Sequence, residues 1–306
     1  AAHARATLLG AADGELVVSS VEKKQRKRQP SPPFITSTLQ QEAVRKLGFT
    51  AQKAMRVAQQ LYEGIDVGEG AVGLITYMRT DSVTLAKDAL HEIREFISTE
   101  YGKELLPAHA RQYKTTSKNA QEAHEAIRPT SAFRKPRRLK DKLSPEQFRL
   151  YELIWKRTIA SQMNHALIDT VSVDLACGRG NTFRASGSTV AEPGFMTVYQ
   201  ESADENVKEE TENDVKLPPL SQGEVLKLNE IRAEQHFTEP PPRFTEASLV
   251  KTLEEYGIGR PSTYASIIST LRQREYVDFD KKRFTPTEVG RIVNRFLTAH
   301  FKNYVD

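Results

Sequence analysis

The sequence predicts a multidomain α+β protein in which two helical winged-helix (CAP-like) units flank a discontinuous β-rich domain. A helix-turn-helix pattern occurs twice, and the chain between the copies changes from helical spacing to short strands near His165. The chain has 306 residues with 38% apolar content, which suits two or three domains. We therefore assign residues 1–32 and 165–236 to the β-rich domain, 33–164 to the first helical unit and 237–306 to the second, which we expect to be incomplete.

The β-rich domain is predicted from two stretches that are far apart in the sequence. Residues 16–21 and 171–175 carry the β-branched and apolar residues typical of strands, and glycine turns follow the second stretch. We expect the two stretches to pair, so that the first helical unit is an insertion between them.

The first helical unit opens at Phe34, and its helical pattern breaks at Gly48 and resumes at Thr50. We expect a strand at residues 73–79, followed by a helix that residues 80–82 cap. A further long helix begins at Ser144, where a serine precedes Pro, Glu and Gln as in a capping box.

The second helical unit repeats the first. Phe244 and Leu249 correspond to Phe34 and Leu39, and the helix breaks at Gly257 and resumes after residues 260–263. Alternating residues 276–284 around a lysine-rich turn then predict a hairpin, and a last helix follows. Two helices and a hairpin indicate a winged helix.

Composition and charge exclude some classes of protein and some kinds of site. No apolar run reaches the length of a membrane span, and Cys177 is the only cysteine, which excludes an internal disulfide or a thiolate zinc site and fits a reducing cytoplasm. The net charge is +4, with basic clusters at 23–28 and 134–138. Such clusters suit a phosphate backbone, and a solvated face or linker is an equally good interpretation. We expect the acidic run 200–214 to be a loop rather than a metal site.

Tyr77 is the candidate nucleophile. On a strand it would share one face with Arg79. A free phenol has a pKa of about 10, but a nearby guanidinium favours the phenolate and binds phosphate oxygens. A tyrosine on a strand is more often a packing residue. The expected helix N-terminus after Tyr77 would also attract an anion, and this favours phosphoryl-transfer chemistry.

Four motifs in order resemble the bacterial type IA DNA topoisomerases. They are PFITSTLQ at 33–40, LITYMRTDS at 74–82 with the active tyrosine, QEAHEAIRP at 121–129 and YGIGRPSTYA at 256–265. The resemblance covers nearly the whole chain. It implies a torus-shaped, ATP-independent isomerase, with the β-rich domain as its arch, that cuts and reseals one DNA strand through a 5′-phosphotyrosine and relaxes negative supercoils.

The resemblance also implies roles for single residues. Tyr77 would be the nucleophile, Arg79 would hold the phosphate and His124 would lie at the cleavage site. Contacts with DNA would come from Arg260, Thr263 and Arg128. The partner would be DNA, mainly single-stranded, and the protein would be a monomer in the cytoplasm, associated with the nucleoid. For His124 and Arg260 the alternative is a structural role at a helix start.

One departure from the family concerns the metal site, and another is that we expect the second winged unit to stop short, without the C-terminal zinc or DNA-binding modules common in the family. The family's N-terminal Toprim domain binds Mg²⁺ through acidic residues, and no such motif precedes Pro33. The Asp-x-Asp at 278–280 suits a hairpin better than a metal site. We expect a fragment that carries the nucleophile, binds no metal itself and is inactive alone.

Two other classes remain open. A non-catalytic winged-helix protein would read duplex DNA with residues 262–272, and sequence-specific duplex binding without a preference for single strands would favour it. A structural scaffold would bind no nucleic acid even at low salt.

Overall fold

The computed structural model describes the whole chain except residues 1, 69, 115–123, 202–215, 304 and 306. It divides the chain into two compact units. Unit 1 comprises residues 1–29, 165–194 and 208–241, and unit 2 comprises residues 30–164, 195–207 and 242–306. Among the described residues, no helix has the length and apolarity needed to cross a membrane.

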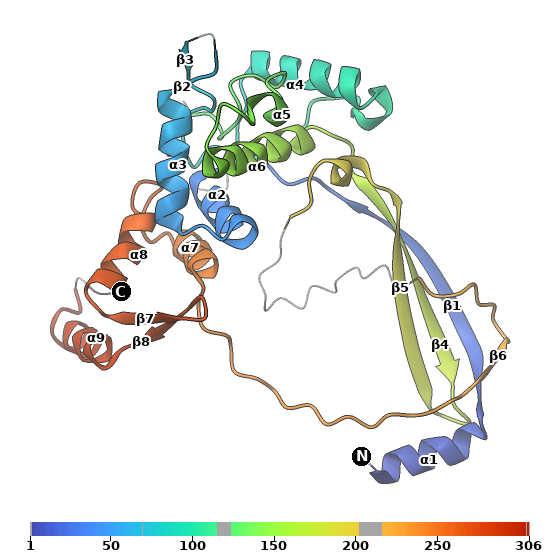
Figure 1. Cartoon of the computed structure of the whole chain (residues 1–306). Coiled ribbons are helices and arrows are strands. Elements are labelled where there is room, and N and C mark those ends of the chain that lie inside the picture. Colours follow the sequence, from blue (N-terminus) through green and yellow to red (C-terminus); the bar gives the residue numbers. More distant parts are fainter. Residues whose placement is uncertain (1, 69, 115–123, 202–215, 304, 306) are drawn as a thin grey trace. The chain divides into compact units, whose positions relative to one another are not determined.

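Unit 1 is an antiparallel sheet with a short helix beside it (Figure 1). The strand order is β5-β4-β1-β6, and β1 pairs with β4 along most of its length, with Val21 opposite Val173. This confirms the predicted pairing of the two distant segments. A small core of Ala12, Leu16 and Cys177 lies at one end. The elements are α1 (Ala2–Ala12), β1 (Glu15–Arg28), β4 (Ala166–Ala176), β5 (Thr182–Glu192) and β6 (Val225–Lys227).

Unit 2 is mainly helical (Figure 1). Its first part contains α2 (Thr36–Glu42), a π-helical turn (Ala43–Leu47), α3 (Ala51–Glu63), β2 (Ile65–Asp66), β3 (Ala71–Val72), α4 (Lys87–Glu100), a 3₁₀ turn (Lys103–Leu105), α5 (Pro136–Leu139) and α6 (Pro145–Ser161). A 3₁₀ turn (Gly194–Thr197) follows β5. The last part contains α7 (Glu246–Glu255), α8 (Tyr264–Gln273), β7 (Val277–Asp280), β8 (Arg283–Pro286) and α9 (Glu288–His300).

The predicted repeat is visible in the helix pairs α2/α3 and α7/α8. Gly48 and Gly257 end the first helix of each pair with φ of 66° and 71°, a left-handed conformation that glycine adopts without strain. Corresponding helices also pack together, α2 against α7 and α3 against α8. The buried Glu246 carboxylate of α7 accepts a hydrogen bond from the Ala51 amide at the start of α3, at 2.7 Å. The two pairs therefore form one packed core.

The long helix α6 supports the first pair. Its N-terminus is capped by Ser144, whose hydroxyl accepts from the Gln147 amide, as the sequence predicts. Trp155 packs edge-on against Phe96 of α4, with ring centroids 5.4 Å apart, and its indole donates to the Ala132 carbonyl. These contacts fix α4 and the chain that precedes α5.

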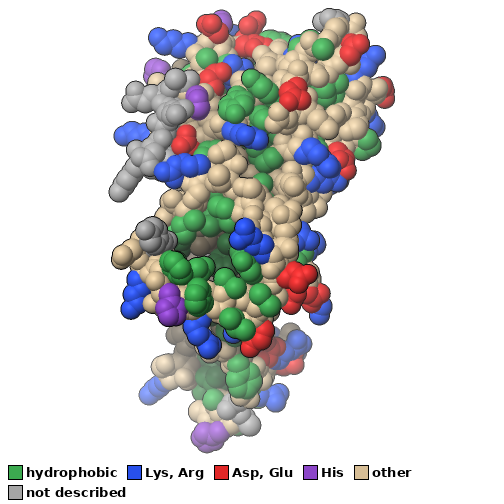
Figure 2. Space-filling view, turned by 90° about the vertical axis from the view of Figure 1, so that its left-hand side faces the viewer, with side chains coloured by type: hydrophobic (Ala, Val, Ile, Leu, Met, Phe, Trp, Pro, Cys, Tyr) green, Lys and Arg blue, Asp and Glu red, His purple; other side chains and the backbone are tan. Residues whose placement is uncertain are grey.

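Apolar side chains also collect on the outside of the second helical part. Figure 2, viewed from the side on which α8 and α9 lie in Figure 1, shows hydrophobic side chains around a hollow. Helix α9 contributes exposed apolar residues along its length, namely Val289, Ile292, Phe296 and Leu297.

Candidate active site

Tyr77 lies in an irregular segment, so the strand predicted at residues 73–79 is wrong. The only regular pairing there is an isolated bridge between Ile75 and Pro129, after the two-residue strand β3. Exposure nevertheless alternates as on a strand, because Tyr77 and Arg79 are exposed while Met78 between them is buried. The two candidate side chains therefore both reach the surface without a sheet beneath them.

The backbone on the N-terminal side of Tyr77 is held by residues 126–128. The Thr76 amide donates to the Arg128 carbonyl at 2.9 Å, and the Arg128 amide donates to the Thr76 hydroxyl at 2.9 Å. That hydroxyl in turn donates to the Ala126 carbonyl at 2.6 Å. Two segments that are far apart in the sequence are thus joined immediately beside Tyr77.

The backbone on the C-terminal side is held by Thr36, the first residue of α2. The Thr36 hydroxyl donates to the Met78 carbonyl at 2.8 Å and accepts from the Thr80 amide at 2.9 Å, and the Thr36 amide donates to the Thr80 carbonyl at 2.9 Å. Thr36 and Thr80 are both buried. Tyr77 is therefore an exposed side chain on a backbone that is anchored on both sides, which pre-organises it.

Two further rings lie against Tyr77. The His124 ring lies edge-on to it, with centroids 6.5 Å apart, and the Tyr62 ring of α3 lies at 5.4 Å. The Tyr77 hydroxyl has no hydrogen-bond partner among the residues that the structure describes. The structure thus brings together Tyr77 and His124, two of the three predicted catalytic residues, and places Tyr62 against the Tyr77 ring.

The predicted helix N-terminus beside Tyr77 is also wrong. Residues 81–86 are not helical, and α4 begins only at Lys87, with Ala86 as its N-cap. Residues 80–82 therefore do not cap a helix. Arg79 is exposed and makes no hydrogen bond or ion pair with any other described residue, so its guanidinium is available for an anionic ligand.

Arg128 occupies a different environment. Its guanidinium forms an ion pair with Glu125 at 2.8 Å and donates to the Pro129 carbonyl at 3.0 Å. The Glu125 carboxylate also accepts from the Ala86 amide at 2.5 Å. Arg128 thus holds the segment that carries His124. Residues 121–123 of the same motif lie outside the described part of the chain.

Arg260 and Thr263 form the turn that precedes α8. The Arg260 amide donates to the Thr263 hydroxyl at 2.8 Å, and the Thr263 amide donates to the Arg260 carbonyl at 2.8 Å. The Arg260 side chain is exposed and donates to the Gly259 carbonyl. The Thr263 hydroxyl is therefore used to shape the turn, while the Arg260 guanidinium keeps donors for a ligand.

Asp81 links the Tyr77 segment to the second helix pair. Burial raises the pKa of the Glu254 carboxyl near the end of α7, the Ser37 side chain partly offsets this rise, and the negative charges of Glu255 and Asp81 add to it. Burial likewise raises the pKa of the Tyr264 phenol at the start of α8, and Glu254 and Asp81 add to the effect. The motif at 256–265 thus lies within electrostatic range of the segment that carries Tyr77.

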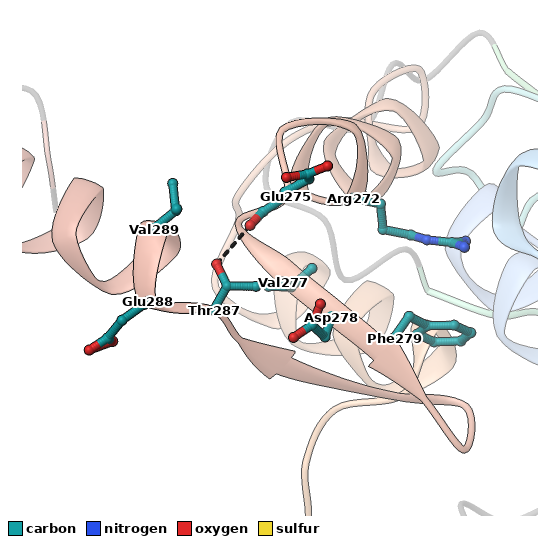
Figure 3. Close-up of a pocket in the computed structure, with 8 residues that line it drawn as sticks. All are labelled: Arg272, Glu275, Val277, Asp278, Phe279, Thr287, Glu288 and Val289. Atoms are coloured by element: carbon teal, nitrogen blue, oxygen red, sulfur yellow. Dashed lines mark hydrogen bonds between the residues drawn. The ribbon is translucent and has the colours of Figure 1, made fainter.

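The hairpin β7–β8 borders a separate pocket of about 510 Å³ (Figure 3). Arg272 lies over the Phe279 ring at 4.9 Å, and the Thr287 hydroxyl donates to the Glu275 carbonyl at 2.7 Å. Asp278 lies on the hairpin, as the sequence predicts, and lines this pocket. The described residues contain no group of three or more His, Cys, Asp or Glu able to hold a metal ion.

Sequence reasoning missed Thr36, Thr76 and Tyr62. Thr36 belongs to the motif at 33–40, which is far from Tyr77 in the sequence, and no local pattern places it beside Tyr77. Tyr62 carried a local signal. It follows the buried Leu61 at the end of an amphipathic helix, where an aromatic residue falls on the exposed face.

Comparisons with known proteins identify the family. The DNA topoisomerase family profile matches residues 2–306. DNA topoisomerase 1 of Xylella fastidiosa strain Temecula1 is 59% identical over 100% of this chain and 38% of its own length, and that of Rickettsia bellii is 58% identical over 94% and 36%.

A solved structure gives the same result. Full-length topoisomerase I from Thermotoga maritima superposes with a TM-score of 0.83 at 37% identity, over 97% of this chain and 47% of that one. The chain spans less than two fifths of the length of the Xylella and Rickettsia relatives. The chain belongs to the DNA topoisomerase family.

Proposed function

We propose that this chain is the part of a type IA DNA topoisomerase that carries the nucleophile, with Tyr77 cutting one DNA strand and resealing it. The observation that supports this most directly is Tyr77 itself. Its side chain is 44% exposed, its backbone is anchored on both sides, and His124 and Arg79 lie beside it. Three of the four predicted motifs supply Thr36, Tyr77 and His124 to this region.

The reaction is a transesterification. The Tyr77 Oη attacks the phosphorus of a DNA phosphodiester, an Oη–P bond forms and the P–O3′ bond breaks. The phenol proton leaves Oη, and the departing O3′ accepts a proton to become a free hydroxyl. The 5′ phosphate stays on Tyr77, so the free energy of the phosphodiester is retained and the reverse reaction reseals the strand without ATP.

The neighbouring side chains have distinct parts in this proposal. The exposed Arg79 guanidinium holds the non-bridging oxygens as their charge grows. His124, in ring contact with Tyr77, lies where it can relay a proton or contact phosphate. Arg260 and Arg128 contact the DNA strand, and Arg128 in addition positions His124 through Glu125. Thr263 would affect DNA binding indirectly, because its hydroxyl shapes the turn that carries Arg260.

The wider architecture is part of the same proposal. Helices α7 and α8 with the hairpin β7–β8 form a winged helix, α2 and α3 form its counterpart, and the sheet of unit 1 is the arch. The protein is a monomer that acts on single-stranded DNA in the nucleoid of the cytoplasm. Mg²⁺ would be held by a Toprim domain, and the steps above involve this chain's side chains alone.

Covalent trapping tests the nucleophile. In a protein of the relatives' full length that contains this chain, a labelled single-stranded oligonucleotide should form an adduct that survives SDS. Tyr77→Phe should abolish the adduct, because it removes the attacking oxygen. Tyr113→Phe is the matched control, since that phenol is partly buried and donates to the Ser161 carbonyl at 2.7 Å. An undiminished adduct in Tyr77→Phe would overturn the assignment.

The chain by itself gives a second readout. We expect it to bind single-stranded DNA, measured by fluorescence anisotropy at low salt, and not to relax supercoiled DNA with Mg²⁺ and no other protein added. Relaxation under those conditions would refute the division of the site between this chain and a Toprim domain.

A further inference from the structure

We propose that Tyr62 is a stacking site for a nucleobase next to the scissile phosphate. The inference rests on the proposed function, because it supposes that Tyr77 attacks DNA. Tyr62 lies in the last turn of α3 and is 41% exposed, whereas the preceding Leu61 is fully buried. Its ring is 5.4 Å from that of Tyr77 with an angle of 66° between the planes. Two exposed phenols thus lie in edge-to-face contact.

The relative position of the two tyrosines is fixed by the backbone. The Leu74 amide donates to the Leu61 carbonyl at 2.7 Å, which ties the segment before Tyr77 to the end of α3. At Gly73 the two chains approach so closely that a Cβ would lie 2.8 Å from the Tyr62 carbonyl oxygen. The ring contact is therefore set by main-chain packing in addition to side-chain preference.

The charges around Tyr62 favour a base over a phosphate. Tyr62 is in the C-terminal turn of α3, where the helix dipole is negative, and Glu63 follows it. Gln59 donates to the Glu63 carboxylate at 2.5 Å and keeps that charge in the last turn. A phosphate would be repelled here and is better placed at Arg79, two residues beyond Tyr77.

The geometry then assigns a different part of one DNA strand to each ring, the scissile phosphate to Tyr77 and a neighbouring base to Tyr62. When the phosphorus lies at the Tyr77 hydroxyl, the attached base is one sugar away. The Tyr62 ring, 41% exposed and 5.4 Å from the Tyr77 ring, is an aromatic surface close to the position of that base. Stacking on an aromatic ring is favourable for every base, so this site would hold the strand in position without selecting a sequence.

Fluorescence of 2-aminopurine tests the proposal on this chain. Single-stranded oligonucleotides carrying one 2-aminopurine at successive positions are titrated with the protein, and their affinity is measured by anisotropy. We expect quenching at one position, which marks the stacked base. Tyr62→Leu should lose that quenching and weaken binding by roughly 5- to 100-fold. Tyr62→Phe should retain both, because it keeps the ring.

Two further variants separate stacking from folding. Tyr62→Trp, with a larger ring, should bind at least as tightly as the unsubstituted chain and quench as strongly, and loss of either would count against stacking. Phe133→Leu is the control, since Phe133 is 38% exposed and in edge contact with another ring, Phe96, at 5.3 Å. Its affinity and quenching should not change.

The outcomes distinguish the inference from the proposed function. Unchanged affinity and quenching in Tyr62→Leu would overturn the stacking site and leave the function of Tyr77 intact. Failure of the unsubstituted chain to bind any single-stranded oligonucleotide would overturn both.

Discussion

Replacing Thr36 by valine should loosen the segment that presents Tyr77. Valine has nearly the shape of threonine, so the packing of this fully buried position is kept while the hydroxyl is lost. That hydroxyl accepts from the Thr80 amide and donates to the Met78 carbonyl. The substitution therefore removes the anchor on one side of Tyr77 and leaves Tyr77 itself unchanged.

The magnitude follows from the groups that lose a partner. The Thr80 amide is left without this acceptor, and the Met78 carbonyl without this donor, whereas the Thr80 carbonyl keeps the Thr36 amide at 2.9 Å. A buried polar group without a partner costs about 1–3 kcal/mol. Partial relaxation of the loop reduces the sum, so we expect the free energy of unfolding of unit 2 to fall by about 2–4 kcal/mol.

Thr158→Val is the matched control. Thr158 is also fully buried, but its hydroxyl donates to the Ile154 carbonyl one turn earlier in α6, so its loss leaves no amide without a partner. We expect a cost below about 1 kcal/mol. Urea denaturation compares the two variants, and hydrogen exchange of peptides covering residues 76–82 reports the local opening. Equal losses in both variants, or unchanged exchange at 76–82 in Thr36→Val, would refute the anchoring role.

Two other predictions concern nearby positions. Gly73→Ala should destabilise unit 2 by about 1–3 kcal/mol, because its Cβ would meet the Tyr62 carbonyl at 2.8 Å, and an unchanged thermal midpoint would contradict this close approach. Burial raises the pKa of Tyr113 to about 12, so above pH 10 the unfolded chain loses this proton before the folded chain does and stability should fall between pH 10 and 12. Tyr113→Phe should make that decline in urea midpoints shallower, and an equally steep decline would show that the Tyr113 proton does not contribute.

The sequence predicted the elements that depend on local signals. The glycine breaks at 48 and 257, the capping box at Ser144 and the pairing of β1 with β4 all follow from patterns within a few residues or from complementary strand composition. The errors around Tyr77 have one physical cause. Residues 73–76 bond to Leu61 and to residues 126–130, and Met78 and Thr80 bond to Thr36, so tertiary hydrogen bonds replace both the strand and the early helix start.

The candidate site shows the same division. Motifs identify Tyr77, Arg79 and His124 as candidate catalytic residues. A motif indicates the chemistry of a side chain, but it does not predict which other residues that side chain contacts. Tyr62 contacts the Tyr77 ring, and Thr36 bonds to the backbone of Met78 and Thr80 in the segment that carries Tyr77. No period or cap predicts such contacts.

The repeat explains how a helical pair comes to expose a nucleophile. In the second copy the Phe244 carbonyl accepts from the Phe284 amide of β8, and in the first copy the corresponding Phe34 carbonyl accepts from the Ile127 amide. Ile127 therefore takes the place that β8 has in the second copy. Because β8 follows its helices after a short hairpin while Ile127 arrives after a much longer stretch, the first copy has room to insert the Tyr77 segment and α4. The segment that takes the place of β8 also contains His124, three residues before Ile127, and so brings it to the Tyr77 ring. The same hydrogen bond that completes a hairpin in one copy thus assembles the candidate active site in the other.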